Sequence, residues 1–425
     1  MRVYVESFGC AQNRGEGGAI ARDLAAAGHD VLAGPDGADV GVLVTCAVIG
    51  PTEARMARRW RALADRVPRV VVTGCLVPLR TGILTGRGRE RTTFVPIREQ
   101  AAIPSLVAAW SATAHLEPSP VPLAPIATTA PASEEIVIAQ GCTSACTYCF
   151  SRLARGRLES VPAATIVRRV AAAVARGVSE VRLTSLDTAA WGAERPGGEG
   201  LPDLLGRISD VPGDFEVRVG MMSPQTLGPI VEPYLDALGS RRFYKFLHLP
   251  VQSGSDDVLR GMRRGYTVAE FRRQVARART RFPELLLSTD VIVGFPGETE
   301  DDHRATEQLL SEVEPETVNV TRFSPRPGTP ASHLPPVGPR IAKRRSRAIA
   351  ELRQRIARRG LERWIGFRGP ARVTEHGPGS SSVARLSNYL PAVLPARYAL
   401  GTGLTLRVEG ARSTYLLARA EPPGF

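Results

Sequence analysis

All six cysteines of this 425-residue chain lie within its first 149 residues, in two groups of three. Disulfide frameworks belong to small, oxidised, secreted domains, whereas cysteines in a large chain more often carry metal or redox chemistry. The second group, Cys142, Cys146 and Cys149, shares one short loop. The first group is Cys10, Cys46 and Cys75. These three residues form one site only if the fold brings three distant segments together.

The first hundred residues alternate β-rich runs with helical patterns, which predicts an α/β fold with an open parallel sheet. Each cysteine of the first group follows directly after a predicted strand. Because the C-terminal ends of parallel strands share one edge of a sheet, we expect these three thiols to converge. The predicted strands are 2–7, 40–45 and 69–73, and the predicted helices are 19–27 and 52–64.

Six further strand-like runs follow, each with a helical pattern behind it, and predict an incomplete (βα)6 barrel. In such a barrel the loops at the C-terminal strand ends carry the chemistry. Before the barrel, residues 116–134 are rich in Pro, Ala and Thr and predict a linker. The six strands are 135–139, 180–185, 215–220, 243–249, 285–294 and 317–323.

The last part of the chain changes character twice. Residues 340–364 predict a helix with ten Arg or Lys against two Glu, either a docking helix with a solvated charged face or an RNA contact. Short alternating runs after it, spaced by Gly and Pro, predict a small all-β barrel. We therefore expect domains at 1–115, 135–365 and 366–425, joined by the linker.

The charge balance is basic. Lys and Arg number 55 against 42 Asp and Glu, which gives a net charge of +13 and a pI near 10.1. Such a balance suits a protein that meets phosphate backbones, although an arginine-rich composition can equally reflect genomic base bias. The chain shows neither a secretory signal nor an apolar run of membrane-spanning length, which predicts a cytoplasmic protein without membrane association.

The strongest local signal is the CxxxCxxC loop directly after the first strand of the barrel. Three thiolates on one tight loop can hold three irons of a four-iron, four-sulfur cluster and leave the fourth iron open to a ligand. Zinc is the alternative, but it normally requires a fourth Cys or His nearby, and no histidine is close to this loop in sequence.

This loop, with Tyr148 before its last cysteine, resembles the radical S-adenosylmethionine superfamily. The resemblance implies that Cys142, Cys146 and Cys149 hold the catalytic 4Fe–4S cluster and that Tyr148 lies near the adenine of S-adenosylmethionine. The amino and carboxylate groups of the cofactor would bind the open iron, and its reductive cleavage would release a 5′-deoxyadenosyl radical.

Motifs at the later strand ends are similar to those of the methylthiotransferase family. The resemblance implies that Asp187, Gln252 and Ser253 lie in the S-adenosylmethionine pocket. Leu186 and Trp191 stand where the family usually has Gln and Tyr, so the contacts of that loop differ from the family pattern. The matching segments are 183–192, 218–224, 246–255, 292–299 and 323–330.

The surroundings of the first cysteine group resemble the auxiliary-cluster domain of the same family. The resemblance implies a second 4Fe–4S cluster held by Cys10, Cys46 and Cys75, able to carry the sulfur that is transferred. Three buried, inert cysteines are the alternative.

The C-terminal segment resembles the TRAM domain, a small RNA-binding barrel. Arg385, Tyr389 and Tyr415 are its candidate RNA contacts, and the two tyrosines either stack on bases or pack in the barrel.

The resemblance implies a radical methylthiotransferase that converts N6-threonylcarbamoyladenosine, next to the anticodon of tRNA on its 3′ side, to the 2-methylthio derivative. One S-adenosylmethionine would methylate a cluster-bound sulfur, and a second would activate the C2–H bond. The expected partners are the tRNA anticodon stem-loop and an electron donor such as flavodoxin or ferredoxin, with the chain acting as a monomer.

Other readings remain open. Isopentenyladenosine in tRNA or a ribosomal protein are alternative substrates. A radical biosynthetic enzyme with a non-tRNA substrate and a non-catalytic RNA-binding protein with structural metal are alternative classes.

Overall fold

The computed structural model of the protein describes residues 1–47, 50–113 and 132–421. The chain divides into two compact units. The first holds the residues up to 113 together with Cys149–Arg157 and Arg326–Gly328, and the second holds the remaining described residues. All but the last three residues of the predicted linker lie outside the described residues.

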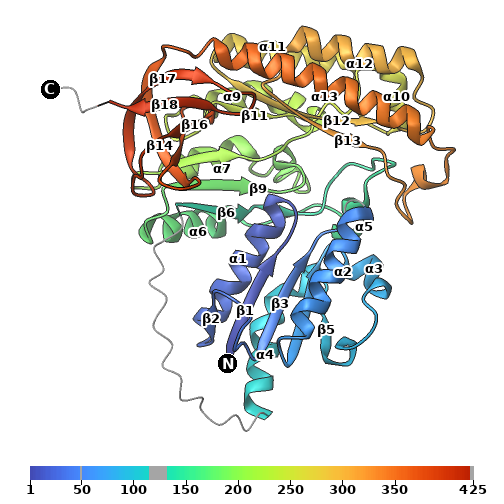
Figure 1. Ribbon diagram of the computed structural model, residues 1–425, viewed down its shortest axis with the longest axis vertical. Helices are drawn as coiled ribbons and strands as arrows, with labels where there is room; N and C mark the ends of the chain where they lie inside the picture. Colours follow the sequence, from blue (N-terminus) through green and yellow to red (C-terminus); the bar gives the residue numbers. More distant parts are fainter. Residues whose placement is uncertain (48–49, 114–131, 422–425) are drawn as a thin grey trace. The chain divides into compact units, whose positions relative to one another are not determined.

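A five-stranded parallel sheet forms the centre of the first unit (Figure 1). β1 (Arg2–Ser7), β3 (Val40–Thr45) and β4 (Arg69–Gly74) confirm the three predicted strands. β2 (Asp30–Leu32) and β5 (Thr92–Phe94) were missed by the prediction, because runs of three residues carry too little periodicity. The strand order is β2-β1-β3-β4-β5. The helical elements of this unit are α1 (Ala11–Ala26), α2 (Gly50–Ala64), α3 (Val77–Arg80), η1 (Thr81–Ile83), η2 (Arg89–Arg91), η3 (Ile97–Ala102) and α4 (Ile103–Thr113).

Helices cover both faces of this sheet, which explains why its central strands are continuous apolar runs. Every residue of β3 is buried. Leu24 of α1 and Val107 of α4 share a core with Val42, whereas Trp60 of α2 packs with Leu43 on the other face. In the strand order, β1, β3 and β4, which precede the three cysteines, are adjacent at the centre of the sheet.

The second unit contains all six predicted barrel strands, in the predicted order along the chain. They form two three-stranded parallel sheets, β10-β9-β6 and β11-β12-β13. A single parallel bridge from Val217 to Phe243 links the two sheets. The strands are β6 (Ser133–Val137), β9 (Glu180–Thr184), β10 (Glu216–Val219), β11 (Phe246–His248), β12 (Leu286–Val293) and β13 (Thr317–Arg322), with a short hairpin of β7 (Ala139–Gln140) and β8 (Glu159–Ser160).

Helices follow these strands and bury a large apolar core against them. The resulting α/β layer confirms the predicted parallel barrel region. Within the described part of the chain, none of the helices combines the length and the apolar composition that crossing a lipid bilayer requires. The helical elements are α6 (Ala163–Ala175), η4 (Thr188–Ala190), α7 (Leu201–Ser209), α8 (Pro224–Leu227), η5 (Gly228–Ile230), α9 (Val231–Leu238), α10 (Asp256–Gly261), α11 (Val268–Arg281), α12 (Glu300–Val313) and η6 (Pro330–His333).

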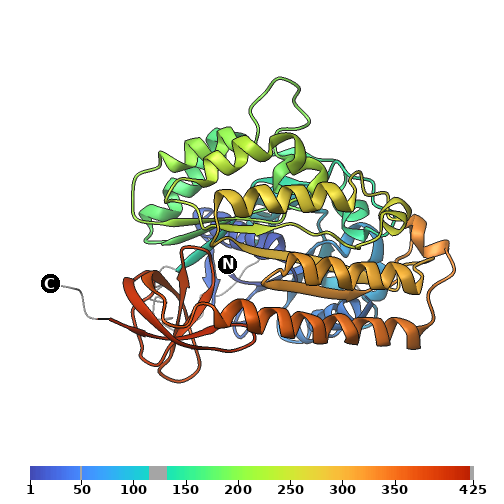
Figure 2. The same cartoon turned by 90° about the horizontal axis from the view of Figure 1, so that it is seen from above.

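The predicted basic helix is α13 (Pro339–Glu362), and in Figure 2 it leads directly into the C-terminal barrel. Ile349, Leu352 and Ile356 of α13 pack into the core of the second unit, so one stripe of the helix is a docking face. The closed barrel confirms the predicted all-β segment. Its strands are β14 (Arg368–His376), β15 (Ser382–Leu386), β16 (Pro391–Leu394), β17 (Gly403–Ala411) and β18 (Leu416–Ala420).

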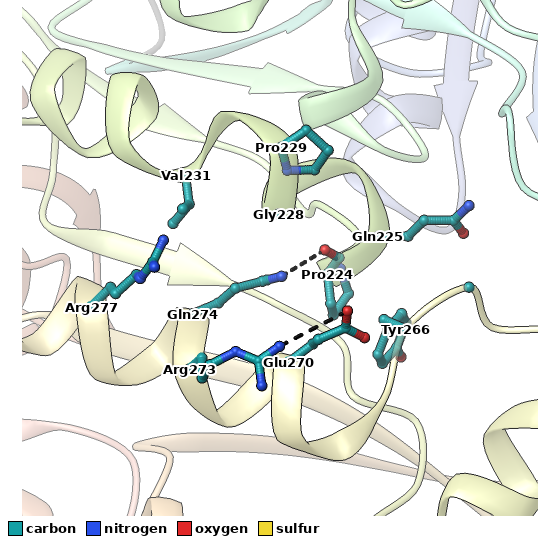
Figure 3. Close-up of a pocket in the computed structure, with 11 residues that line it drawn as sticks. Pro224, Gln225, Gly228, Pro229, Val231, Tyr266, Glu270, Arg273, Gln274 and Arg277 are labelled. Carbon is teal, nitrogen blue, oxygen red and sulfur yellow. Dashed lines mark hydrogen bonds and ion pairs between the residues drawn. The ribbon is translucent and has the colours of Figure 1, made fainter.

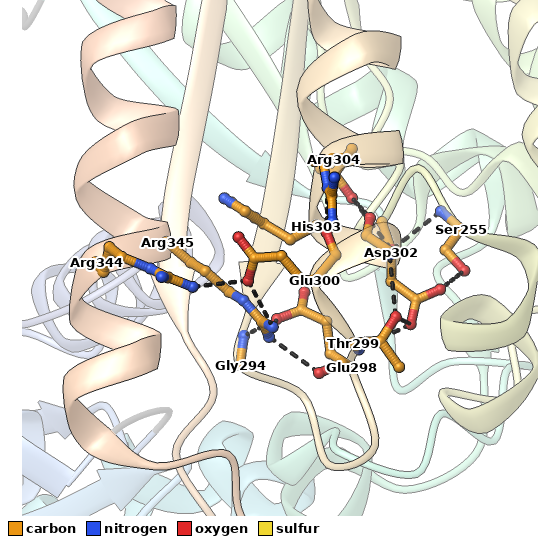
Figure 4. Close-up of polar contacts among 12 residues, drawn as sticks. Ser255, Gly294, Glu298, Thr299, Glu300, Asp302, His303, Arg304, Arg344 and Arg345 are labelled. Carbon is orange, nitrogen blue, oxygen red and sulfur yellow. Dashed lines mark hydrogen bonds and ion pairs between the residues drawn. The ribbon is translucent and has the colours of Figure 1, made fainter.

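The turn after β12 is fastened to α13 by a buried ion pair (Figure 4). Arg345 donates to Glu298 at 2.7 Å, and both side chains are almost fully enclosed. Glu298 also accepts from the Gly294 amide at 2.7 Å, and Thr299 forms a capping box with Asp302 at the start of α12. Segment 292–299, which matches the family motif, therefore stabilises the loop at the end of β12.

Candidate active site

The structure brings the first cysteine group together at the C-terminal edge of the first sheet. Cys10 follows β1, Cys46 follows β3 and Cys75 follows β4. A Cβ atom on Gly9 would lie 2.9 Å from the Cys46 Sγ, so only glycine lets the loop before Cys10 pass so close to Cys46. Cys75 lies within electrostatic range of both Cys10 and Cys46.

Side-chain hydrogen bonds hold the three cysteine loops in register. Asn13 donates to the Phe8 carbonyl at 2.6 Å and to the Thr45 carbonyl at 2.9 Å. The Thr45 hydroxyl donates to the Thr73 carbonyl at 2.6 Å and accepts from the Leu76 amide at 3.3 Å. These bonds join the ends of all three strands, so the thiols are positioned by the sheet before any ligand binds.

A buried arginine lies beside these thiols. Arg155 is fully enclosed, forms a bidentate ion pair with Glu16, and donates to the Asn13 Oδ1 at 2.6 Å. Burial raises the pKa of the Cys75 thiol to about 12, and the nearby Arg155 guanidinium opposes that rise. A cation in this place favours the thiolate form that binds iron.

Arg155 reaches this position on helix α5 (Phe150–Arg155), which belongs to the first unit although its sequence follows the CxxxCxxC loop. Phe150 packs in the same core as Cys75. Cys149 is the N-cap of α5, and its Sγ accepts a hydrogen bond from the Arg152 amide at 3.4 Å. One short helix, about 9 Å long, therefore carries a ligand of one predicted cluster at its start and a contact of the other at its end.

A second arginine from the barrel region completes the first unit. Arg326 donates to the Ala47 carbonyl at 3.0 Å, directly after Cys46, and pairs with the buried Glu53. Its guanidinium also lies 4.6 Å from the centre of the Phe150 ring. Sequence patterns did not single out Arg155 or Arg326 as site residues, because both reach the cysteine loops through tertiary contacts alone.

Gly74 provides a test of the first site. It has φ +93°, and a Cβ atom there would lie 2.4 Å from the Thr45 carbonyl oxygen. We expect Gly74→Ala to lower the free energy of unfolding by about 2–4 kcal/mol and to reduce the iron bound after reconstitution. Gly82→Ala is the matched control, because a Cβ atom at Gly82 meets nothing within 4 Å. Equal stability and iron content in the two variants would contradict the expectation.

The CxxxCxxC loop offers hydrogen bonds to sulfur as well. Cys142 Sγ accepts from the Ser144 amide at 3.4 Å, and the guanidinium of Arg264 donates to the Cys146 Sγ at 3.2 Å. Arg264 also contacts the Ser223 hydroxyl at 3.2 Å. Hydrogen bonds to sulfur are a principal means of tuning a cluster's reduction potential. Arg264 is a further residue that the sequence patterns did not identify.

Asp187, a predicted contact of S-adenosylmethionine, is connected to the CxxxCxxC loop by hydrogen bonds through Ser223 and Arg264. Its carboxylate accepts from the Ser223 amide at 3.0 Å and from the Thr226 hydroxyl at 2.8 Å. Burial raises the pKa of this carboxyl above its ordinary value, in opposition to those hydrogen bonds. Ser223 thus connects Asp187 with Arg264, which in turn contacts Cys146.

The other predicted cofactor contacts lie on neighbouring segments of the second unit. Gln252 is held at φ +68°, a strained conformation for a residue other than glycine, and its amide donates to the Asp290 carbonyl at 2.8 Å. Ser253 is fully buried, with its hydroxyl 3.4 Å from that of Thr306. Tyr148 packs against a small apolar cluster that includes Phe295.

The predicted RNA contacts are in different environments. Tyr389 packs edge-on against Tyr244, with ring centres 4.9 Å apart, and donates to Glu180 at 3.2 Å. Arg385 lies over the Tyr389 ring and pairs with Glu375 at 2.8 Å. Tyr415 is half-buried in the turn between β17 and β18. The packing of Tyr389 agrees with the alternative that at least one of the tyrosines is structural.

Both cysteine sites have donor sets that suit an iron–sulfur cluster, namely three cysteine thiols with cationic or N–H donors beside the sulfurs. Within residues 1–47, 50–113 and 132–421, no three Cys, His, Asp or Glu side chains form a group that could hold a single metal ion. A cluster spreads its thiolates over several irons, so this finding does not bear on cluster binding.

A pocket of about 410 Å³ lies among the helices of the second unit (Figure 3). Gln274 of α11 donates across it to the Pro224 carbonyl at 2.8 Å. Tyr266 lines the pocket, and its hydroxyl donates a hydrogen bond to the Val251 carbonyl at 2.8 Å. None of the predicted site residues lines this pocket.

Comparisons with known proteins agree with this architecture. Residues 136–310 match the Radical SAM superfamily, and residues 2–92 match the Uncharacterized protein family UPF0004. The solved structure of the radical S-adenosylmethionine methyltransferase TsrM from Kitasatospora setae has a similar fold, with a TM-score of 0.57 and 15% identity over 78% of this chain and 74% of that one.

Full-length relatives are closer in sequence. The probable threonylcarbamoyladenosine tRNA methylthiotransferase of Methanothermobacter thermautotrophicus is 36% identical over 98% of this chain and 99% of its own length. The threonylcarbamoyladenosine tRNA methylthiotransferase of Homo sapiens is 30% identical over 99% of this chain and 74% of its own length. The chain therefore belongs to the threonylcarbamoyladenosine tRNA methylthiotransferase family of radical S-adenosylmethionine enzymes.

Proposed function

We propose that this protein transfers a methylthio group to C2 of N6-threonylcarbamoyladenosine, next to the anticodon of tRNA. The observation that carries the proposal is the presence of two separate sets of three cysteines in a chain whose relatives match it from end to end. The reaction comprises radical generation and sulfur delivery, and the two sets of cysteines would serve one task each.

Cys142, Cys146 and Cys149 would hold the cluster that binds S-adenosylmethionine, and this cofactor supplies the radical when bound. The chain's own task is to position and tune that site. Arg264 donates to Cys146, while Asp187 and Ser223 set the loops around it.

Cys10, Cys46 and Cys75 would hold a second 4Fe–4S cluster that carries the transferred sulfur. Two of these thiols are buried and Cys10 is exposed. The exposed position leaves an open side through which a substrate can approach. The ion pair between Arg155 and Glu16 would hold the loops of this site rigid, and the positive charge of Arg155 would oppose the negative charge of the thiolates.

The C-terminal barrel would contact the tRNA. Arginines such as Arg407, Arg412 and Arg419 are exposed on its strands and turns, where they can meet phosphate groups. The candidate contacts Arg385, Tyr389 and Tyr415 stay predictions. An external one-electron donor, such as flavodoxin or ferredoxin, would supply the electron, with the enzyme working as a monomer in the cytoplasm.

Nucleoside mass spectrometry tests the substrate. We expect tRNA from cells that lack this protein to lose the 2-methylthio derivative of N6-threonylcarbamoyladenosine, and purified, cluster-reconstituted protein to restore it. Restoration requires the intact cysteines, so a variant with Cys146→Ala is the control. A methylthio group on isopentenyladenosine, or on no tRNA nucleoside at all, would contradict the proposal.

A further inference from the structure

Arg218 faces away from the apolar core of the second unit. It lies on β10, where Val217 and Val219 on either side of it join the core beneath the helices. Because side chains alternate along a strand, Arg218 and Glu216 project from the opposite face. That face is the inner side of the predicted barrel, towards which Phe246 of β11 also projects.

Two aromatic rings hold the Arg218 guanidinium. Its central carbon lies 4.5 Å from the centre of the Phe246 ring and 5.1 Å from that of the Tyr389 ring. Tyr389 keeps its place through a left-handed backbone conformation, φ +74°, and its hydrogen bond to Glu180. A guanidinium stacked on aromatic rings keeps its N–H groups free at the edge for a planar anion.

The carboxylates around Arg218 are engaged by other arginines. Arg182 pairs with Glu180 and, at 3.5 Å, with Glu135. Arg385 pairs with Glu375 at 2.8 Å. The Arg218 Nε is buried and has no hydrogen-bond partner within the described residues, while the side chain as a whole is half-buried. A cation held by aromatic rings, with an unsatisfied buried donor, is ready to bind an anion.

Further polar side chains lie along the inner face of the sheet formed by β11, β12 and β13. His248 follows Phe246 on the same face, and its Nε2 lies 3.0 Å from the Asp290 carboxylate. Asn319 donates to the same carboxylate at 2.7 Å. Burial is the largest single influence on the pKa of Asp290 and raises it, but the hydrogen bond and charge of His248 and the hydrogen bond from Asn319 together outweigh burial, so the pKa lies below its ordinary value.

We propose that the Arg218 guanidinium binds the free carboxylate of the threonylcarbamoyl group on the substrate adenosine. This assignment rests on the proposed function. Threonine is linked to the carbamoyl group through its nitrogen, so its carboxylate stays free and anionic at neutral pH. Arg218 lies about 7 Å along the strand direction from Gly220, where the loop to Ser223 begins. A nucleoside that extends from this loop into the barrel can reach Arg218 with its carboxylate end.

Binding measurements without reductant test this assignment separately from turnover. The probes are two anticodon stem-loop RNAs of the same sequence, one with N6-threonylcarbamoyladenosine and one with unmodified adenosine. We expect the reconstituted protein to bind the modified RNA about 10- to 100-fold more tightly, and Arg218→Gln to remove this preference while it leaves the affinity for the unmodified RNA unchanged. Arg273→Gln, at an exposed arginine on α11, is the matched control and keeps the preference.

The other outcomes overturn the assignment. Equal binding of the two RNAs by the unaltered protein, or an unchanged preference in Arg218→Gln, would show that Arg218 does not read the carboxylate. An equal loss of affinity for both RNAs would assign Arg218 to a phosphate group, and a loss confined to S-adenosylmethionine would assign it to the cofactor. If Arg218→Gln fails to fold, Arg218→Lys decides, because it keeps the charge but loses the bidentate geometry. A full preference in that variant would overturn the assignment.

Discussion

Replacement of Cys10, Cys46 and Cys75 by alanine is expected to abolish methylthio transfer completely while 5′-deoxyadenosine is still formed from S-adenosylmethionine. The physical reason is that these thiols form a site of their own at the edge of the first sheet. Iron after reconstitution should fall from about eight to about four atoms per chain, because two four-iron clusters become one. Iron analysis and quantification of both products measure the result.

The matched variant replaces Cys142, Cys146 and Cys149 by alanine. It should also retain about four irons, but should form neither 5′-deoxyadenosine nor the methylthio product. The two variants therefore separate the radical step from sulfur delivery. Methylthio transfer by the first variant, or an iron content that the replacement of Cys10, Cys46 and Cys75 leaves unchanged, would show that these residues do not bind a cluster.

Arg155→Met is expected to produce the largest loss of stability in the first unit. The Arg155 and Glu16 side chains are 0% and 3% exposed, so removal of the cation leaves a buried carboxylate without its partner. Breaking a buried ion pair in this way costs about 3–5 kcal/mol. Thermal unfolding should show an earlier transition, and the iron held by Cys10, Cys46 and Cys75 should decrease because Asn13 loses a contact as well.

Two further variants decide whether charge is the cause. Glu16→Gln combined with Arg155→Met removes both charges, so it should recover part of the stability. Arg157→Met alters an exposed arginine two positions away and should match the unaltered protein. If the double variant is no more stable than Arg155→Met, or if Arg157→Met is equally damaging, the buried pair does not explain the effect.

Local patterns in the sequence were sufficient for the main elements. The alternation of strands and helices predicted β1, β3 and β4 and all six strands of the barrel region, because buried parallel strands are long apolar runs between amphipathic helices. It missed β2 and β5 in the first sheet, which have three residues each and are recognised only by the neighbours with which they pair.

The candidate site divides in the same way. The convergence of Cys10, Cys46 and Cys75 followed from the position of each cysteine after a parallel strand, and the structure places them at adjacent strand ends. The sequence patterns assigned no site role to the arginines that surround the two sites. Arg155 meets Glu16 across a separation of 139 residues, and Arg326 meets Glu53 across 273. No periodicity in the chain marks contacts of that range.

The sequence by itself determined the order of the elements, the two sets of thiols and the family, because these depend on the identity and spacing of residues along the chain. Only the tertiary structure decided that α5 and Arg326 belong to the first unit and that the Arg218 guanidinium lies against the Phe246 and Tyr389 rings, with its Nε lacking a hydrogen-bond partner among the described residues. The physical reason is that burial and charge pairing are properties of the whole packed unit. An arginine becomes a site residue only through the neighbours that folding brings to it.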